Sequence, residues 1–384
     1  MQETSLVDLA PLLHLLALGA LLAAAPLAWV WLRHRGATPA ARLRALTLLT
    51  LFLCFDLVLF GAFTRLTDSG LGCPDWPGCY GNASPLGARA EIHVEQSVRP
   101  SGPVTHGKAW VEMTHRYLAT GVGALIAAIA ATSWFEVWRR RAPISPWWAT
   151  VTLVAVCLQG AFGALTVTLK LYPAIVTLHL LGGMALLVLL AAQSQVFVPV
   201  PLELPAGLRR GVVVVALLGA LQIALGGWVS TNYAVLACRD FPTCHGTWWP
   251  EMDFTHGFTL LRELGQTDAG GYLPFAALTA IHYTHRLVAY VLLVAIALLA
   301  WRLRAAADPG AHRWAVALGA VALWQLASGL GNVVLGWPLV AAVAHTGGAA
   351  ALVVVLTVLL MRIGQAHRVP VPAADAPLPW RTAP

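Results

Sequence analysis

Charged residues are scarce in this sequence. They make up 11% of the 384 residues, against roughly 25% in soluble domains, whereas hydrophobic residues make up 58%. A soluble fold has no use for so much apolar surface, so this composition excludes a soluble domain and indicates a polytopic membrane protein. No Lys/Arg-rich stripe with interleaved aromatic residues suggests a nucleic-acid groove. The net charge of +7 is therefore interpreted as a signal of membrane topology, and no nucleic-acid partner is expected.

Long apolar runs predict the membrane-spanning helices, because about 20 apolar residues cross a bilayer. The first run is too long, and its flanks are too poor in basic residues, for a cleaved signal peptide. We therefore predict an all-α polytopic protein with about nine transmembrane helices embedded in a lipid bilayer. The expected spans are residues 11–32, 45–64, 113–135, 147–169, 174–198, 211–231, 276–300, 314–335 and 340–361.

The positions of Lys and Arg predict the orientation of these spans. Of the 24 Lys and Arg residues, 15 lie in four connections (33–44, 139–141, 209–210 and 302–313) and in the tail after Met361. All five segments lie on one side of the membrane if the nine spans are right. The positive-inside rule places that side in the cytoplasm. The N-terminus and the connections 65–111 and 231–280 are then expected outside.

The sequence contains an internal duplication. Gly61–Gly81 resembles Gly226–Gly246, and Leu158–Gly183 resembles Trp324–Gly348, at offsets of about 165 residues. Four helices followed by four similar helices keep the same orientation, so the halves are expected to be related by an axis along the membrane normal. We predict two parallel-repeat four-helix bundles plus one extra N-terminal helix. The expected divisions are 1–44 (the extra helix and a basic loop), 45–199, 200–361 and a cytoplasmic tail, 362–384.

A shorter pattern recurs in the outward-running helices, where a glutamine precedes a glycine by four positions: Gln159 and Gly163, Gln222 and Gly226, Gln325 and Gly329. We interpret it as helix packing, with small residues allowing close approach and amides bonding across helices. Asp56 is assigned the equivalent place before Gly61. Because an acid in mid-helix costs about 2.5–3.5 kcal/mol, Asp56 is expected to be neutral or to face the bundle interior with a partner.

Each half supplies two histidines at matched positions: His115 and His179, then His285 and His345. We expect His115 in the first turn of its helix, and all four histidines within a turn or two of the outer surface. Opposed imidazoles are axial ligands of haem iron, so each pair is a candidate haem site. Zinc is the lesser alternative, since no cysteine or carboxylate cluster completes a tetrahedral set.

Ionisable residues accompany the first histidine of each pair, in the sequences ExxHR and HxxHR. Arg116 and Arg286 could hold haem propionates bidentately, or could simply extend to the membrane surface from helix ends. Glu112 lies one helical turn from His115 on the same face, where the second half has His282. It is a candidate proton acceptor or cation stabiliser. The alternative is an acid favoured by a helix N-terminus.

Four of the six cysteines lie in the outer connections, as the pairs Cys73/Cys79 and Cys238/Cys244. Disulfides are expected in an oxidising space. A loop of about six residues gains only about 2 kcal/mol of chain-entropy stabilisation. Shaping a lid over each haem site and exchanging electrons are therefore both open roles.

Several of these segments closely resemble the bacterial haem A synthases: TRLTDSGLGCPDWPGCYG, EMTHR, HYTHR, TLHLLGG and AHTGG. The resemblance covers about residues 45–361; the extra N-terminal helix departs from the eight-helix core of that family. It implies a multi-pass protein of the bacterial inner membrane with its cysteine-bearing loops on the periplasmic side. Mitochondrial relatives generally lack these cysteines.

The resemblance also implies a reaction, namely oxidation of the C8 methyl of haem O to a formyl group through hydroxylated intermediates. The haem A formed would serve terminal oxidases. It implies a haem b on His285 and His345, a substrate haem O between His115 and His179, and a functional role for Glu112. A membrane haem O synthase and a haem A-containing terminal oxidase are the implied partners. The electron acceptor, the oxygen source and any homo-oligomer stay open.

Two other functions fit part of the pattern. A di-haem b electron-transfer cytochrome, such as a quinol oxidoreductase subunit, would also use four histidines, but a wire across the membrane needs haems at two depths. A haem transporter with parallel repeats would leave Glu112 and the matched histidines without a chemical task.

Overall fold

The computed structural model describes residues 10–142 and 144–366. Within them the chain is helical, and nine helices are long and apolar enough to span a membrane, as predicted. These are α1 (Ala10–Arg33), α2 (Pro39–Leu66), α4 (His106–Trp138), α5 (Trp147–Thr168), α6 (Pro173–Val196), α7 (Ala206–Thr231), α9 (Phe275–Arg304), α10 (Pro309–Val334) and α11 (Leu339–Ala366). The short helices are α3 (Arg89–Val98), the 3-10 turn η1 (Ala234–Leu236) and α8 (Phe254–Gly257).

Several spans begin or end outside the expected ranges. α2 begins at Pro39 and α4 at His106, six and seven residues before the expected starts. Thr38 caps α2 and Thr105 caps α4, each by accepting a hydrogen bond from a backbone N–H of the first turn. The apolar run marks only the part of a helix that crosses hydrocarbon, whereas the helix continues through polar residues to its cap.

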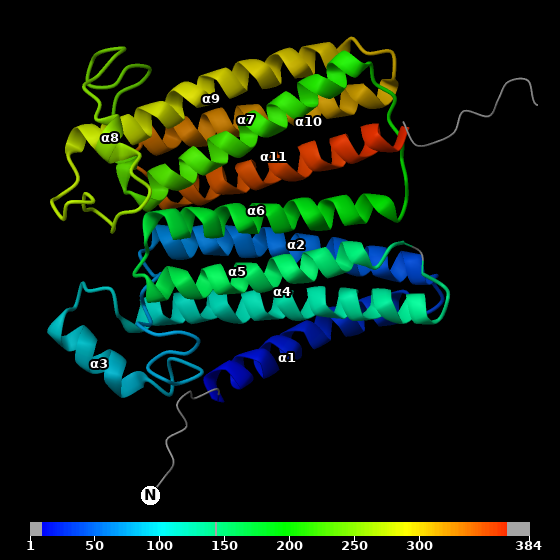
Figure 1. Ribbon diagram of the computed structural model, residues 1–384, viewed down its shortest axis with the longest axis horizontal. Helices are drawn as coiled ribbons and strands as arrows, with labels where there is room; N and C mark the ends of the chain where they lie inside the picture. Colours follow the sequence, from blue (N-terminus) through cyan, green and yellow to red (C-terminus); the bar gives the residue numbers. More distant parts are fainter. Residues whose placement is uncertain (1–9, 143, 367–384) are drawn as a thin grey trace, which may run out of the picture.

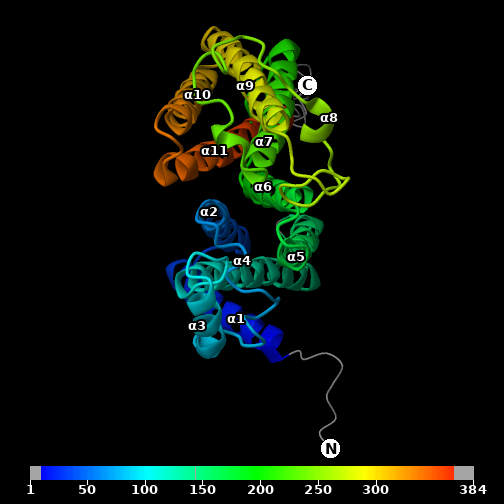
Figure 2. The same ribbon diagram turned by 90° about the vertical axis from the view of Figure 1, so that its left-hand side faces the viewer.

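Eight of the nine spanning helices in the described residues form two rings of four (Figure 2). α2, α4, α5 and α6 contact one another around the first ring, and α7, α9, α10 and α11 do so around the second. α6 contacts α7 and α11, and α2 contacts α11, so α6 and α11 join the rings at the centre. α1 packs outside the first ring on α4, and the repeat relation between the two rings stays a prediction. The boundaries of the four predicted segments stay a prediction, and residues 367–384 of the tail lie outside the described residues.

Apolar burial links the rings. One buried cluster combines Cys54 of α2, Ile126 of α4, Leu187 of α6, Ile223 of α7 and Ala350 of α11. The second ring has its own cluster, which includes Val212, Leu299 and Leu318. Because each central helix contributes to a shared apolar core, the two rings pack as one body rather than as separate domains.

Two structured connections lie at the same end of the bundle, at the left of Figure 1. The first, between α2 and α4, holds the Cys73–Cys79 disulfide and α3; the second, between α7 and α9, holds the Cys238–Cys244 disulfide and α8. α4, α6, α9 and α11 all begin at this end (Figure 1). The candidate histidines on these four helices therefore lie toward the disulfide-bearing end.

Asp56 does not face the bundle interior. Its side chain is exposed on α2, so the alternative in which it faces the interior with a partner is wrong, and the alternative of a neutral acid stays a prediction. The register explains the error, because Leu57 and not Asp56 precedes Gly61 by four positions. Adjacent helical residues point about 100° apart. Asp56 is thus turned away from the face that the glutamines occupy in the other helices.

Candidate functional site

Each of the four histidines packs against a glycine of the neighbouring helix. A Cβ atom added to the glycine would lie close to the Cε1 atom of the imidazole in all four places: 3.1 Å for Gly61 and His115, 3.3 Å for Gly163 and His179, 3.0 Å for Gly226 and His285, and 3.2 Å for Gly329 and His345. Such distances are shorter than ordinary van der Waals contact. The four rings therefore share one setting in which a larger residue would have to displace the imidazole, and this setting repeats between the halves.

The glutamines of the Gln-to-Gly pattern bond across helices, as predicted. Gln159 donates to the backbone carbonyl of His179 (2.7 Å), Gln325 to that of His345 (2.8 Å) and Gln222 to that of His285 (3.1 Å). Each bond ties a histidine backbone to the helix that supplies the glycine under its ring, since a residue and the fourth one after it share a helix face. The amide and the glycine together fix where the imidazole lies.

His115 is positioned by contacts that differ from those of the other three histidines. It lies on α4, and the glycine under it, Gly61, lies on α2, which has Leu57 at the glutamine position. The ring of Phe60 is nearly parallel to that of His115, with centroids 6.2 Å apart. His115 is also the tenth residue of α4, so the expectation that it lies in the first turn of its helix is wrong.

The two imidazoles of each half lie on helices of the same ring: His115 on α4 and His179 on α6 in the first, and His285 on α9 and His345 on α11 in the second. The Nδ1 atoms of His115 and His179 are buried and find no hydrogen-bond partner among the described residues. A buried polar atom without a partner is costly. The first pair is therefore open to a ligand that bonds imidazole nitrogen.

The second pair is more fully bonded. Ser328 lies 2.9 Å from Nδ1 of His345. The Gln222 amide nitrogen lies 3.0 Å from Nδ1 and 3.3 Å from Nε2 of His285. A hydrogen bond at one ring nitrogen orients an imidazole for metal binding at the other, so at His285 a metal would replace the Gln222 contact with Nε2. Among residues 10–142 and 144–366, no three His, Cys, Asp or Glu side chains gather as a metal site. Two histidines per site suit the axial positions of a haem, which supplies the other ligands itself.

The side chain of Glu112 contacts the loop closed by the Cys73–Cys79 disulfide, called here the first disulfide loop, and does not lie at a helix end. It is the seventh residue of α4 and 4% exposed. One carboxylate oxygen accepts a hydrogen bond from the backbone N–H of Cys73 (2.8 Å), and the other forms a short ion pair with Arg116. The helix dipole acts mainly within the first turn, so the dipole does not account for this acid.

Arg116 joins the same loop. Its Nη1 atom donates to the carbonyls of Asp75, Pro77 and Gly78 at 3.0, 3.1 and 2.6 Å, while Nη2 holds Glu112. Both Nη atoms thus have partners within the protein, and propionate binding by Arg116 stays a prediction. The structure assigns this arginine the additional task of bonding the loop to α4.

The second half repeats the arrangement without a carboxylate. Arg286 donates from Nη1 to the carbonyls of Asp240 (2.7 Å) and Thr243 (2.6 Å), and from Nη2 to that of Cys238 (3.0 Å). His282 takes the place of Glu112 and bonds the carbonyl of Ala234 through Nδ1 at 3.0 Å. Arg286 therefore also holds its loop, and its role toward a propionate likewise stays a prediction.

The two disulfide loops have the same backbone design. Cys73 pairs with Cys79 and Cys238 with Cys244, as predicted. Asp75 accepts hydrogen bonds from the backbones of Tyr80 and Gly81, and Asp240 does the same from His245 and Gly246. The residues whose N–H groups donate these bonds all have positive φ: Tyr80, Gly81, His245 and Gly246. The buried disulfides and these carboxylate bonds give each loop a defined shape over its histidine pair.

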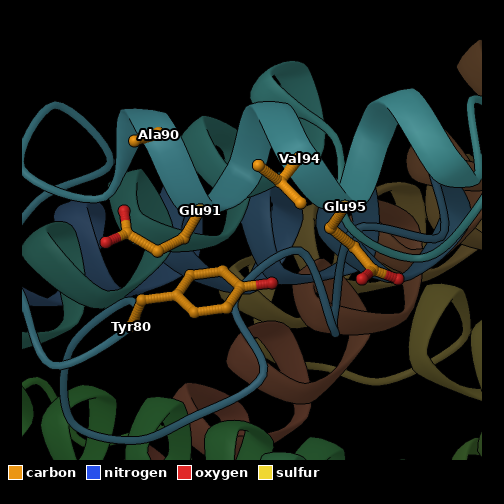
Figure 3. A pocket seen from close by; sticks show the side chains of 5 residues that line it. All are labelled: Tyr80, Ala90, Glu91, Val94 and Glu95. Carbon is orange, nitrogen blue, oxygen red and sulfur yellow. The ribbon is translucent and has the colours of Figure 1, made fainter.

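A shallow hollow lies beside the first loop but apart from the histidines. It has a volume of about 410 Å³ and is lined by Tyr80, Ala90, Glu91, Val94 and Glu95, with the glutamates of α3 above the tyrosine ring (Figure 3). Partial burial raises the pKa of Tyr80, and the charges of Glu95, Asp75 and Glu91 raise it further. None of the predicted site residues lines this hollow.

Sequence reasoning missed the glycines under the rings and the two loop aspartates. A signal for both was present: three of the four glycines stand four positions after a glutamine, and Asp75 and Asp240 are separated by the same offset as the cysteine pairs. The glycines were interpreted only as packing residues, because the sequence does not say which side chain of the neighbouring helix faces them.

Comparisons with known proteins agree on one family. The sequence model COX15-CtaA, described as cytochrome oxidase assembly protein, matches residues 44–357. A protein of Shewanella oneidensis named Heme A synthase is 37% identical over 81% of this chain and 93% of its own length. Proteins with the same name from Methylorubrum populi (30% identity, 87% of this chain, 88% of its own length) and Rhizorhabdus wittichii (28%, 84% and 95%) are also similar. The region that the family model matches begins after α1.

Proposed function

The chain belongs to the COX15-CtaA family of cytochrome oxidase assembly proteins, whose similar members are named haem A synthase, and from this premise we propose that it oxidises the C8 methyl of haem O to the formyl group of haem A. As a haem A synthase it is an oxidoreductase of haem A biosynthesis, acting in a membrane. The oxidation proceeds in our proposal through hydroxylated intermediates, and the product supplies a haem A-containing terminal oxidase.

One observation carries this proposal, namely the difference between two otherwise matched sites. Both halves place two imidazoles over glycines beneath an arginine-held disulfide loop. Only the first half adds a buried carboxylate, Glu112, where the second has His282. Duplicated sites that differ at one ionisable position suit one reacting site and one supporting site.

The residues present fit a haem in each half. His285 and His345 would hold a haem b, whose chemistry when bound is one-electron transfer. The bonds to Gln222 and Ser328 orient these two imidazoles. His115 and His179, with buried and unpartnered Nδ1 atoms among the described residues, would receive haem O as substrate.

Glu112 is the proposed catalytic acid–base group of the first site. Oxidation of the methyl releases protons and builds positive charge on the macrocycle, and a carboxylate one helical turn from His115 stabilises that charge or accepts a proton at a carboxylate oxygen. The ion pair with Arg116 and the Cys73 N–H fix the carboxylate in place. The first disulfide loop holds both side chains, through the Cys73 N–H to Glu112 and through the carbonyls that accept from Arg116.

The proposed setting rests on the distribution of basic residues along the sequence. We propose the bacterial inner membrane, with both disulfide loops in the periplasm, because 15 of the 24 Lys and Arg lie in segments assigned to the other side. Haem O is a membrane-soluble substrate, and a haem O synthase is its proposed source. The electron acceptor is a separate partner whose chemistry these residues do not define.

The test is analysis of the haems bound to protein purified from cells that make haem O. Haem b together with haem O and haem A supports the proposal. Haem b alone at two equivalents contradicts it and favours a di-haem b cytochrome. Added haem O that is never converted, with a reductant, oxygen and electron acceptors supplied in turn, contradicts it as well.

A further inference from the structure

The N-terminal helix α1 lies outside the region that the family model matches, yet it packs closely on α4. Figure 1 shows α1 running beside α4, with the outer end of α1 near the first disulfide loop. A Cβ added to Gly19 would stand 2.7 Å from Cβ of Thr120, and one added to Gly121 would stand 3.4 Å from Cβ of Leu22. The two helices therefore cross at close range near the middle of α1.

The outer end of α1 reaches the disulfide loop itself. Leu15 is 3% exposed and belongs to the buried apolar cluster that contains both Cys73 and Cys79, together with Met113 of α4. Pro11 is also buried, and a Cβ added to Gly78 would lie 3.3 Å from Cβ of Pro11. α1 thus packs against the first disulfide loop on the side that faces away from the interior of the four-helix ring.

These contacts connect α1 to Glu112 in a short series. Pro11 packs on Gly78, whose carbonyl accepts a hydrogen bond from Arg116 (2.6 Å). Arg116 forms the ion pair with Glu112, and Glu112 accepts the hydrogen bond from Cys73 at 2.8 Å. The position of the loop therefore sets the position of the carboxylate, and α1 is one of the surfaces that sets the position of the loop.

The second half has a different support. In the described part of the chain α9 contacts α7, α10 and the short elements α8 and η1, with no additional spanning helix beside it. Trp228 of α7 donates to the carbonyl of Gly257 in α8, at 2.8 Å. The site that carries the carboxylate is thus the one with a dedicated transmembrane support.

We propose that α1 is a positioning element of the first site, holding the Cys73–Cys79 loop on α4 so that Arg116 and the loop N–H aim the Glu112 carboxylate at the substrate. This inference rests on the proposed role of Glu112. It predicts that loosening the outer end of α1 frees the loop and slows conversion of haem O, while the second site keeps its haem.

Neighbouring leucines of α1 provide a matched test. Leu15→Ala removes a buried side chain, whereas Leu16→Ala removes one that is 53% exposed. Each variant is treated in membranes with a water-soluble phosphine reductant, and the rate at which Cys73 and Cys79 become open to a thiol label is measured. Cys238 and Cys244 serve as the internal reference. Haem A formation and the haem b spectrum are measured on the same preparations.

We expect Leu15→Ala to speed reduction of the first disulfide about tenfold, because truncating a buried leucine costs enough for local opening to become more frequent. Haem A formation should fall in parallel, with the second disulfide and haem b unchanged. Leu16→Ala should match the wild type, and Leu15→Met, which conserves volume, should restore both readouts. Pro11→Ala, which leaves the crossing at Gly19 intact, provides the same test if Leu15→Ala does not fold.

Equal reduction rates in Leu15→Ala, Pro11→Ala and Leu16→Ala would overturn the proposal. Faster reduction with unchanged haem A formation would overturn it too, because the loop would then be free without any effect on the site. Failure of the proposed function has a different signature. Normal haem A formation in Glu112→Gln would remove the role of Glu112, while the reduction rates would still report whether α1 holds the loop.

Discussion

The imidazole of His285 lies directly against Gly226 of the neighbouring helix, so that a Cβ added to this glycine would stand 3.0 Å from the Cε1 atom. The glycine does not serve a backbone conformation, since it lies within the regular helix α7. It serves the ring, and any side chain there must displace the imidazole. The same relationship holds at Gly61, Gly163 and Gly329.

We therefore expect Gly226→Ala to weaken haem binding in the second half. The added methyl would push the His285 ring by a few tenths of an ångström against neighbours that are already in contact, and metal ligation depends on ring position. Haem b per protein, from the reduced-minus-oxidised spectrum, should fall several-fold. Gly219→Ala on the same helix meets only Leu352, at an ordinary 3.8 Å, and should keep its haem. Equal haem content in the two variants would contradict the proposed ligand setting.

The two histidine pairs should separate by phenotype. His285→Ala or His345→Ala should remove the stably bound low-spin haem b, whereas His115→Ala or His179→Ala should abolish haem A formation and leave that haem in place. Optical spectra and chromatography of extracted haems measure the two effects. A full haem b signal in His285→Ala and His345→Ala would refute the assignment of the halves.

The two disulfides should be present and accessible from outside the cell. A membrane-impermeant thiol label should react with Cys73, Cys79, Cys238 and Cys244 in intact spheroplasts only after reduction. Cys54 lies within the membrane-spanning part of α2, where an impermeant label does not reach, and should stay unlabelled under the same conditions. Free thiols at all four loop positions in unreduced protein would count against the periplasmic placement of both loops.

Asp240 makes the shape of the second loop sensitive to acid. Partial burial disfavours its charge, but hydrogen bonds from Thr243, Gly246 and His245 outweigh burial and hold the pKa of this carboxyl well below its usual range. A lowered pKa in the folded state stabilises the loop above the unfolded pKa, near 3.9. That stabilisation is lost as the pH falls from there through the folded pKa.

Because protonation lowers the reactivity of a phosphine, its rate toward Cys238–Cys244 is divided by its rate toward a small-molecule disulfide at the same pH. This ratio should be constant between about pH 5 and 7 and should rise in stronger acid. Asp240→Asn should be more reducible at neutral pH and should lose that acid dependence. Asp253→Asn is a control, because its carboxylate caps α8 through the His256 backbone and lies outside the loop. A wild-type acid response that survives in Asp240→Asn would show that another group controls the loop.

The sequence alone was sufficient for those features that apolar length and repetition determine. The nine spans and the cysteine pairs follow from hydropathy and spacing, and the four histidines stand out because each has a counterpart about 165 residues away. The helix ends were less accurate. His115 was expected in a first turn because the apolar run begins at residue 113, whereas α4 begins seven residues earlier, at His106. Hydropathy reports the bilayer, whereas the helix ends where a cap such as Thr105 accepts its first backbone N–H.

The features that the sequence did not predict depend on tertiary contacts. The carbonyl partners of Arg116 belong to residues 38 to 41 positions earlier in the chain, and no local pattern indicates that the loop folds back onto α4. The exposure of Asp56 depends on a one-residue difference in register. The task of α1 depends on Pro11 meeting Gly78, which no periodicity reveals.

The sharpest prediction concerns Glu112. Gln at this position keeps an oxygen that can accept the Cys73 N–H but loses the charge that pairs with Arg116 and the ability to take a proton. We expect Glu112→Gln to fold, to keep haem b, and to convert haem O about 10²–10⁴ times more slowly, the usual contribution of a positioned acid–base group. Haem O or a hydroxylated intermediate should accumulate, and chromatography of extracted haems measures both.

Glu136→Gln supplies the matched control for this substitution. Glu136 is a second buried carboxylate of α4, is 8% exposed, and pairs with an arginine, Arg141, at 3.4 Å. It lies near the opposite end of the helix, away from the histidines. If losing a buried carboxylate that pairs with an arginine merely destabilises α4, both variants should lose haem A formation alongside protein yield. Our proposal requires that Glu136→Gln make haem A at a near-normal rate per folded protein while Glu112→Gln does not. Near-normal haem A in Glu112→Gln would end the catalytic role and leave Glu112 as a tie between α4 and the disulfide loop.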